Sequence, residues 1–328
     1  MSGATLSILA AGVFVAALAA SLASWALLGR RGVVDIPNPR SSHRTPVIGG
    51  GGIGFVAVIL AGWLGLALSG APGLPPMVLA GALAVGLISL LDDVRGVHWS
   101  IRLAVQALAV GAALAALPGG PVLAGGLPLV LDRLILGLAW LWFVNLFNFM
   151  DGIDGIAGTE ALVVAFGIVV IALAAGLPGW PVPAALVVGA AVAGFLPFNL
   201  PRARMFMGDV GSTTLGYALG WLLILVAAEG ALAPAILLGL YFVADATSTL
   251  LMRAARRERL HEAHRHHAYQ RAVDRGLPHA TVSMAVGALG VFLVALGGLA
   301  LDRPVLALGL GVIATGAFVL WLRGRLSR

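Results

Sequence analysis

Residues 132–155 read DRLILGLAWLWFVNLFNFMDGIDG, an apolar run that ends in amides, carboxylates and glycines. The apolar part, residues 132–149, is long enough to cross a bilayer, because a helical span needs about 17–25 residues. Asn145, Asn148 and Asp151 follow at intervals of three, so they fall on one face of the helix end. The stretch therefore predicts a transmembrane helix that delivers polar side chains to a membrane surface.

Similar apolar runs follow one another along almost the whole chain. Of its 328 residues, 60% are hydrophobic and only 10% are charged, a balance that excludes an ordinary soluble domain. The runs are continuous, unlike the short alternating strands of a transmembrane barrel. Crossings are predicted at residues 4–28, 51–70, 76–91, 101–118, 132–149, 157–175, 182–199, 212–228, 232–252, 280–300 and 304–322. The predicted fold is one all-α domain over residues 1–328, a polytopic integral membrane protein with eleven transmembrane helices.

The arginines predict how these helices are oriented. All 20 basic side chains are arginine, and 18 of them fall beside the loops after odd-numbered crossings or in the C-terminal tail. Only Arg133 and Arg303 fall on the other side. Because basic residues gather in cytoplasmic loops, we expect a periplasmic N-terminus and a cytoplasmic C-terminus. This asymmetry accounts for the formal charge of +6 without any nucleic-acid partner.

Carboxylates gather at one end of the predicted bundle. Each lies at the end of an apolar run, and the runs concerned are separated by two crossings, so all should reach the same membrane face. They are Asp92, Asp93, Asp151, Asp154 and Asp209. Adjacent carboxylates such as Asp92 and Asp93 repel one another and need a compensating cation. That pair is either a metal or proton-transfer pair or a solvated helix end, and Asp209 alone would be an ordinary helix cap.

Two further groups of polar side chains suit phosphate chemistry. Asn148 and its carboxylate neighbours offer the oxygen ligands that Mg²⁺ prefers. The basic loop 253–279 mixes arginines with imidazoles, which suits anionic phosphates. If His264 or His267 must be cationic to hold phosphate, activity should weaken above about neutral pH, since imidazole titrates near about 6.5. The alternatives are contact with anionic lipid head groups and zinc binding by His261, His264, His266 and His267.

Three residues or short runs elsewhere are interpreted structurally. The run Gly49–Gly52 predicts close helix packing, because a phosphate loop would also need a lysine. Asp245 lies inside a predicted crossing and should face the bundle, where it can pair with an arginine. No role is assigned to His279.

Taken together, the motifs resemble the polyprenyl-phosphate N-acetylhexosamine-1-phosphate transferases (glycosyltransferase family 4), membrane enzymes that start lipid-linked glycan synthesis. The resemblance rests on five stretches in the family's order, at residues 35–43, 92–96, 148–155, 206–209 and 264–271. It implies Mg²⁺-dependent transfer of a HexNAc-1-phosphate from a UDP-N-acetylhexosamine to undecaprenyl phosphate, with release of UMP. Mn²⁺ is expected to substitute. The implied location is the bacterial cytoplasmic membrane, in contact with membrane lipid, with the active site on the cytoplasmic face.

The resemblance also assigns roles to individual residues. The implied catalytic residues are Asp92, Asp93, Asp151, Asp209, His264 and His267, although which aspartate is a base stays open. The implied substrate-binding residues are Arg102, Asn145, Asp154 and Arg265. The implied metal ligands are Asn148 and Asp209. A homodimer is left open by the sequence.

The histidine loop bears on the subtype. The muramyl-pentapeptide branch carries three consecutive histidines, whereas this chain reads His264-Arg265-His266-His267. The loop is closer to the branch that starts O-antigen or related surface polysaccharides, with UDP-GlcNAc the expected donor. Two alternatives stay open: the muramyl-pentapeptide transferase, and a transporter in which the acids and histidines form an ion or proton path.

Overall fold

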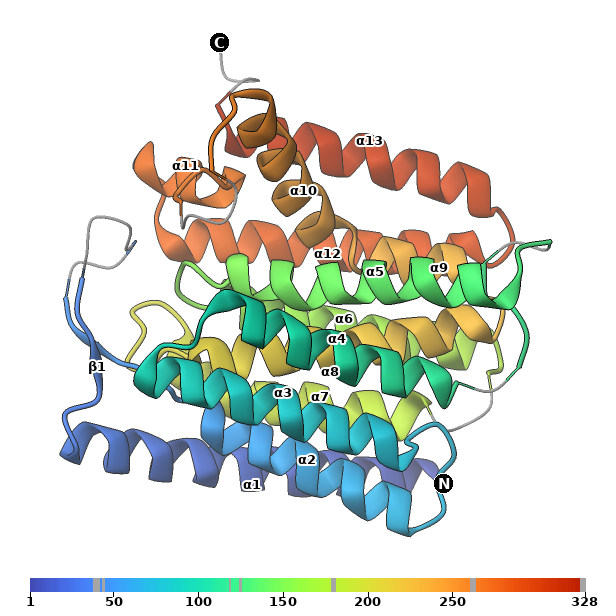
Figure 1. The fold of residues 1–328 in the computed structure, drawn as a ribbon, viewed down its shortest axis with the longest axis horizontal. Coiled ribbons are helices and arrows are strands. Elements are labelled where there is room, and N and C mark those ends of the chain that lie inside the picture. Colours follow the sequence, from blue (N-terminus) through green and yellow to red (C-terminus); the bar gives the residue numbers. More distant parts are fainter. Residues whose placement is uncertain are drawn as a thin grey trace.

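The computed structural model describes residues 1–37, 42, 45–117, 119–123, 126–177, 181–259 and 264–324. Within these ranges the chain is a bundle of helices with one two-stranded sheet (Figure 1). The helices are α1 (Gly3–Arg30), α2 (Gly52–Leu68), α3 (Pro76–Arg95), α4 (Trp99–Ala115), α5 (Leu129–Phe149), α6 (Ile156–Ala174), α7 (Pro181–Asn199), α8 (Gly208–Ala228), α9 (Leu232–Leu238), α10 (Leu240–Ala255), α11 (Ala268–Asp274), α12 (His279–Ala300) and α13 (Pro304–Leu322). The strands are β1 (Val34–Asp35) and β2 (Val47–Ile48), which pair antiparallel. The all-helical, multi-pass prediction is confirmed.

Every predicted crossing coincides with a helix or a helix pair. Among the described residues, eight helices are long and apolar enough to cross a membrane, and the bent pair α9–α10 makes a ninth candidate. The remaining two, α2 and α4, are apolar but have only 17 residues each, the lower limit for a span. Eleven crossings and the orientation of the two termini therefore stay predictions.

The structure corrects three details. The predicted crossing 232–252 is not continuous, because α9 and α10 meet at Gly239 with a bend of 66°. Glycine is a poor helix former, and Phe143 packs 3.0 Å from the position where a Cβ of Gly239 would lie. The loop 253–279 contains the short helix α11, and the β1–β2 pair was not predicted, since two-residue strands leave no periodicity to detect.

The centre of the bundle is α8. Its most apolar stretch is completely buried, whereas that of α1 is only 17% buried. Close packing against α8 depends on glycine: a Cβ on Gly52 would lie 2.6 Å from the Cα of Gly211 on α8. The prediction that the run Gly49–Gly52 serves helix packing is confirmed for Gly52. On another side, the indole N–H of Trp140 on α5 donates to the Tyr217 carbonyl on α8 at 3.0 Å, so α5 and α8 are held in register.

The polar connections gather at one end of the bundle. In Figure 1, β1 and α11 lie at the end opposite the N-terminus. Met205, just before α8, bridges to Ile48 of β2, and Phe206 donates its N–H to the Ile48 carbonyl at 2.8 Å. The small sheet therefore holds the chain leading into α8 at that end, where the predicted site residues also lie. Residues 38–41 and 43, which belong to the resembling stretch 35–43, lie outside the described residues.

Candidate active site

The carboxylates of α3 lie against the start of α8. Asp93, in the last turn of α3, accepts hydrogen bonds from the N–H groups of Asp209 and Val210, at 3.0 Å and 3.1 Å. The first N–H groups of a helix have no partner within that helix, so Asp93 caps α8 from a neighbouring helix. Gly208 permits this approach: its φ is +70°, and a Cβ there would lie 2.8 Å from the Asp93 carboxylate. Asp93 thus fixes the position of Asp209.

An arginine joins the remaining two carboxylates of this group. The guanidinium of Arg102, on α4, donates to Asp92 and, at 2.8 Å, to Asp209. Asp92 also accepts the N–H of Val97 at 2.6 Å, which ties the turn between α3 and α4 to the same carboxylate. A cation therefore bridges acids from two helices, and this reduces the repulsion expected of clustered carboxylates.

The two asparagines of α5 are held by their amide nitrogens. Asn145 donates to the Gln106 side chain on α4 at 2.9 Å and to its own helix at the Leu141 carbonyl. Asn148 donates to the Ser212 hydroxyl on α8 at 3.1 Å. Because each side-chain nitrogen already donates to a protein group, the side-chain oxygen of each asparagine is the atom available to accept a hydrogen bond or bind a cation. Sequence reasoning missed Gln106 and Ser212; the signal was a polar residue within an otherwise apolar predicted helix.

The loop after α5 adds two carboxylates in different settings. Asp151 lines a cavity of about 230 Å³ together with Asn148 and Asp209. Burial raises the pKa of Asp151 well above its usual range, and the charges of Asp209, Asp154 and Asp93 raise it further. Asp154 accepts the Ala203 N–H at 3.1 Å and lies 3.2 Å from the Nδ1 of His279. His279, which had no predicted role, therefore belongs to this site.

The histidine segment closes the site from another side. His264 and His267 line a cavity of about 430 Å³, and their rings lie 4.8 Å apart. Burial lowers the pKa of both imidazoles to about 3. The neighbouring His267 also lowers the pKa of His264, and the charge of Arg323 also lowers the pKa of His267. Both imidazoles are therefore neutral at pH 7 in this structure. A cationic histidine that holds phosphate would therefore need the arriving phosphate to stabilise its charge, and this role stays a prediction.

Three cavities adjoin at these residues. The 430 Å³ cavity shares Asn148 and Asp209 with the 230 Å³ cavity. The latter shares Ser42, Asp154 and His279 with a third cavity of about 910 Å³. Side chains from α4, α5, α8, α10 and the histidine segment (residues 264–267) therefore line adjacent cavities, and Asn148 and Asp209 lie between the first two.

Most of the predicted site residues are brought together here. Those that line one or both of the first two cavities are Arg102, Asn145, Asn148, Asp151, Asp154, Asp209, His264 and His267. Asp92 and Asp93 do not line these cavities. Asp92 accepts a hydrogen bond from Arg102, and Asp93 accepts one from the start of α8. Arg265 does not join the first cavity: it pairs with Asp274 at 2.8 Å and lines the third.

The donor set at the junction fits an oxygen-binding divalent cation. Mg²⁺ typically takes one or two carboxylates and completes its shell with water and substrate phosphates, and Asn148 and Asp209 offer an amide and a carboxylate to a shared space. Among the residues that the structure describes, no three His, Cys, Asp or Glu side chains are grouped to hold a metal. This gives the zinc alternative no support, with His261 outside the described residues.

Comparison with known proteins identifies the family of the chain. The family pattern of glycosyl transferase family 4 matches residues 75–227. A phospho-N-acetylmuramoyl-pentapeptide-transferase from Symbiobacterium thermophilum is 33% identical over 229 residues, which cover 63% of this chain and 67% of that protein. The chain belongs to glycosyl transferase family 4. The family-matched segment runs from α3 to α8 and so contains the carboxylates, Arg102 and both asparagines, but not the histidine segment.

Two further relatives of this family 4 chain are named for transfer of N-acetylglucosamine phosphate, unlike the Symbiobacterium relative. A decaprenyl-phosphate N-acetylglucosaminephosphotransferase from Mycobacterium tuberculosis is 34% identical over 216 residues, covering 59% of this chain and 53% of that protein. A probable undecaprenyl-phosphate N-acetylglucosaminyl 1-phosphate transferase from Bacillus subtilis is 27% identical over 296 residues, covering 86% and 81%. The chain thus spans about half the length of the mycobacterial relatives it matches.

Proposed function

We propose that this family 4 chain transfers a HexNAc-1-phosphate from a UDP-N-acetylhexosamine to undecaprenyl phosphate and releases UMP. One observation carries the proposal: Asn148 and Asp209 line both a cavity with one apolar wall and a smaller cavity rich in carboxylates. The Mycobacterium tuberculosis and Bacillus subtilis relatives are named for a polyprenyl phosphate and N-acetylglucosamine, which supports UDP-GlcNAc as the donor. The arginine distribution supports a cytoplasmic active site in the bacterial inner membrane.

The 430 Å³ cavity suits the lipid substrate. Its walls include apolar side chains from α4, α5 and α10, namely Trp99, Leu103, Trp142, Phe149 and Leu250. Trp99 and Phe149 are also exposed on the outside of the bundle, where a prenyl chain would lie between helices. Arg102 lines the same cavity, so a lipid phosphate entering with its chain in this groove would meet a guanidinium suited to binding phosphate oxygens.

The other two cavities suit the nucleotide sugar. The smaller one is lined by Asp151, Asp154 and His279 and the larger one by Arg202 and Arg265. A UDP-sugar lying across them would place its pyrophosphate at Asn148 and Asp209. When bound there, Mg²⁺ would neutralise charge on the pyrophosphate during phosphoryl transfer, and Mn²⁺ is expected to substitute.

The chemistry needs alignment more than a strong base. An oxygen of the lipid phosphate forms a bond to the β-phosphorus of the UDP-sugar, and the bond from that phosphorus to UMP breaks. A phosphate monoester has a second pKa of about 6, so the attacking oxygen is already ionised at pH 7. Asp92 and Asp93 are engaged with Arg102, with the Val97 N–H and with the start of α8. We therefore assign both a positioning role toward Arg102 and Asp209.

The downstream product is the finer part of the proposal. The sequence His264-Arg265-His266-His267 favours an enzyme that starts O-antigen or a related cell-envelope glycan over the muramyl-pentapeptide transferase. The relatives compared above are named as transferases, which leaves the transporter alternative without support.

The test is an assay of the full chain in lipid nanodiscs. Undecaprenyl phosphate, Mg²⁺ and a panel of UDP-GlcNAc, UDP-GalNAc and UDP-MurNAc-pentapeptide are supplied separately, and UMP and lipid-linked sugar are measured. We expect product with UDP-GlcNAc and none from the Asp209→Asn variant. Activity only with the peptide-bearing nucleotide would make the chain a muramyl-pentapeptide transferase. No UMP with any of the three would refute the proposed function.

A further inference from the structure

A second buried carboxylate, far from the metal-binding junction in sequence, lies at the base of the histidine segment. Asp245 of α10 has no exposed surface and lines none of the three cavities. It therefore does not reach substrate. Burying a carboxylate is costly unless it is hydrogen-bonded and paired, so its contacts should reveal what it does.

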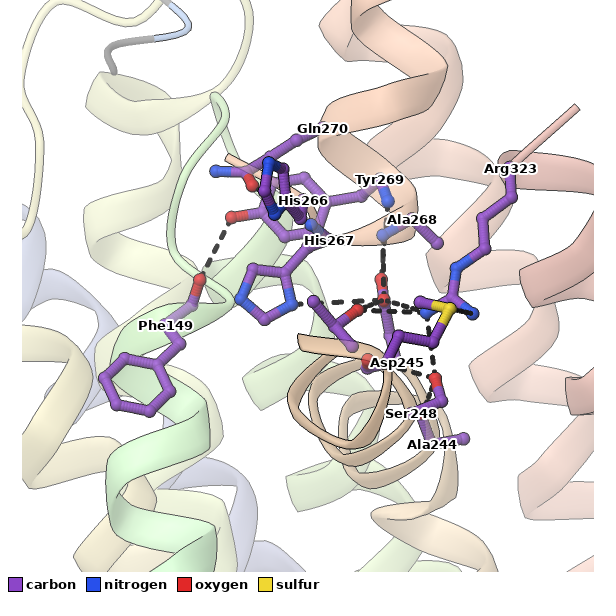
Figure 2. A network of polar contacts seen from close by, with 12 residues as sticks. Phe149, Ala244, Asp245, Ser248, His266, His267, Ala268, Tyr269, Gln270 and Arg323 are labelled. Atoms are coloured by element: carbon purple, nitrogen blue, oxygen red, sulfur yellow. Dashed lines mark hydrogen bonds and ion pairs between the residues drawn. The ribbon is translucent and has the colours of Figure 1, made fainter. Parts of the chain in front are cut away.

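Those contacts point to α11. The Asp245 carboxylate accepts the N–H groups of Ala268 and Tyr269 at 2.8 Å and 3.3 Å, which are the first two residues of α11. It also accepts the Thr249 hydroxyl at 3.2 Å and the Tyr241 hydroxyl at 3.4 Å. Figure 2 shows the bonds from Ala268 and Tyr269 converging on the Asp245 side chain at the point where α11 begins. Asp245 caps α11 in the same way that Asp93 caps α8.

An arginine from the last helix supports this cap. The guanidinium of Arg323, at the end of α13, lies 3.7 Å from Asp245 and donates to the hydroxyls of Ser248 and Thr249 at 2.9 Å each (Figure 2). The sequence expectation that Asp245 faces the bundle beside an arginine is confirmed. The charge of Asp245 is thus balanced by an element that takes no part in lining the cavities.

The capped end of α11 lies beside the reacting groups. His267, which lines the first cavity, immediately precedes Ala268. The ring of Tyr269 stacks on that of His267, with 5.7 Å between the ring centroids. Its hydroxyl donates to the carbonyl of Phe149, the residue after Asn148 on α5, at 3.0 Å (Figure 2). A shift of the α11 start would therefore move His267 relative to Asn148.

We propose that Asp245, supported by Arg323, is a positioning residue. It fixes the start of α11, and with it the preceding histidine segment (residues 264–267), against the active-site end of α5. The effect of Asp245 on activity rests on the proposed transfer reaction, whereas its contact with α11 does not. The contact itself makes a structural prediction that can be measured without substrate: the amides of Ala268 and Tyr269 are protected from hydrogen exchange by the Asp245 carboxylate.

The first measurement is hydrogen–deuterium exchange of the full chain in nanodiscs. In Asp245→Asn one acceptor oxygen and the charge are lost, and we expect exchange in a peptide spanning residues 264–274 to accelerate at least tenfold. The matched control is Asp132→Asn at the opposite end of α5, because Asp132 is equally buried and accepts two N–H groups, from Val122 and Leu123. That variant should speed exchange near its own loop and leave residues 264–274 unchanged.

The second measurement separates positioning from general damage. Asp245→Asn should lower kcat/KM at least tenfold in the wild-type background but less than twofold in a His264→Ala/His267→Ala background, since coupled residues are non-additive. Equal losses in both backgrounds would overturn the proposal. If Asp245→Asn does not fold, Thr249→Val removes a single donor and should speed the same exchange more modestly; unchanged exchange there would also overturn it. A wild-type chain without any transfer activity would refute the proposed function, while the exchange data would still decide the anchoring of α11.

Discussion

Replacing Asp93 separates a helix cap from a catalytic base. In Asp93→Asn one oxygen can still accept an N–H from α8, but the second acceptor and the charge are lost. A hydrogen bond to a charged group contributes about 1.5–3 kcal/mol, and loss of an N-cap costs about 0.5–2 kcal/mol. Because Asp93 is exposed at its site, solvent screening favours the lower end, about 1–2 kcal/mol.

This cost should appear in both stability and rate. The melting temperature should fall by about 1–3 °C, because the shift for a given free energy shrinks as the chain lengthens. Transfer should slow by about 10- to 100-fold, because a displacement of about 1 Å of a positioned group can cost about 10²-fold. Asp93→Ala, which leaves no acceptor, should be lower than Asp93→Asn in both quantities.

The assay is thermal unfolding in detergent alongside UMP release at saturating substrate, with wild type, Asp93→Asn, Asp93→Ala and the remote Asp132→Asn. The graded order wild type, Asn, Ala in both measurements supports a cap. Asn and Ala variants that are equally inactive, with melting temperatures equal to that of wild type, would refute the cap and restore Asp93 as a base.

Three further predictions concern the cations and histidines of the site. Arg102→Lys should retain part of the transfer rate, and Arg102→Met should lose nearly all of it, because only a cation can bridge Asp92 and Asp209; equal rates in both variants would show that the charge is not needed. The pKa of His267 is lowered to about 3 in the folded chain. As pH falls, this imidazole is therefore protonated in the unfolded chain before it is protonated in the folded chain. The stability contributed by the neutral imidazole is therefore full above about pH 6.5 and is lost as pH falls toward 3. His267→Gln should accordingly flatten the fall in melting temperature between pH 7 and pH 4.5, and an unchanged slope would contradict the shift. EDTA should abolish UMP release and Mg²⁺ or Mn²⁺ should restore it, whereas full activity in EDTA would remove the metal from the reaction.

The helices and the gathering of polar residues at one end of the bundle were predictable from the sequence. The length of each apolar run can be measured along the chain, so crossings such as 132–149 coincide with helices, and Arg102 does join the carboxylates of α3 and α8. Long runs carry this information because each span must satisfy its backbone hydrogen bonds internally.

Partners within the site were not predictable. An Asp at a helix start reads as that helix's own cap, whereas Asp209 is instead held by Asp93 from 116 positions away. The bend at Gly239 and the pairing of Asp154 with His279 likewise depend on which helices become neighbours. Glu160, completely buried on α6, carried no motif and was missed. Spacing along the chain identifies residues for a site, but contact between helices decides what each one does.

Binding of Mn²⁺ to the chain, followed by electron paramagnetic resonance, tests most directly whether α5 and α8 build one cation site. In the presence of UDP-GlcNAc, wild type and Asp132→Asn should bind one ion per chain. Loss of an outer-shell partner alone costs about 10–100-fold in metal affinity, so Asp209→Asn should weaken binding by at least that much. Equal Mn²⁺ affinity in wild type and Asp209→Asn would contradict the account.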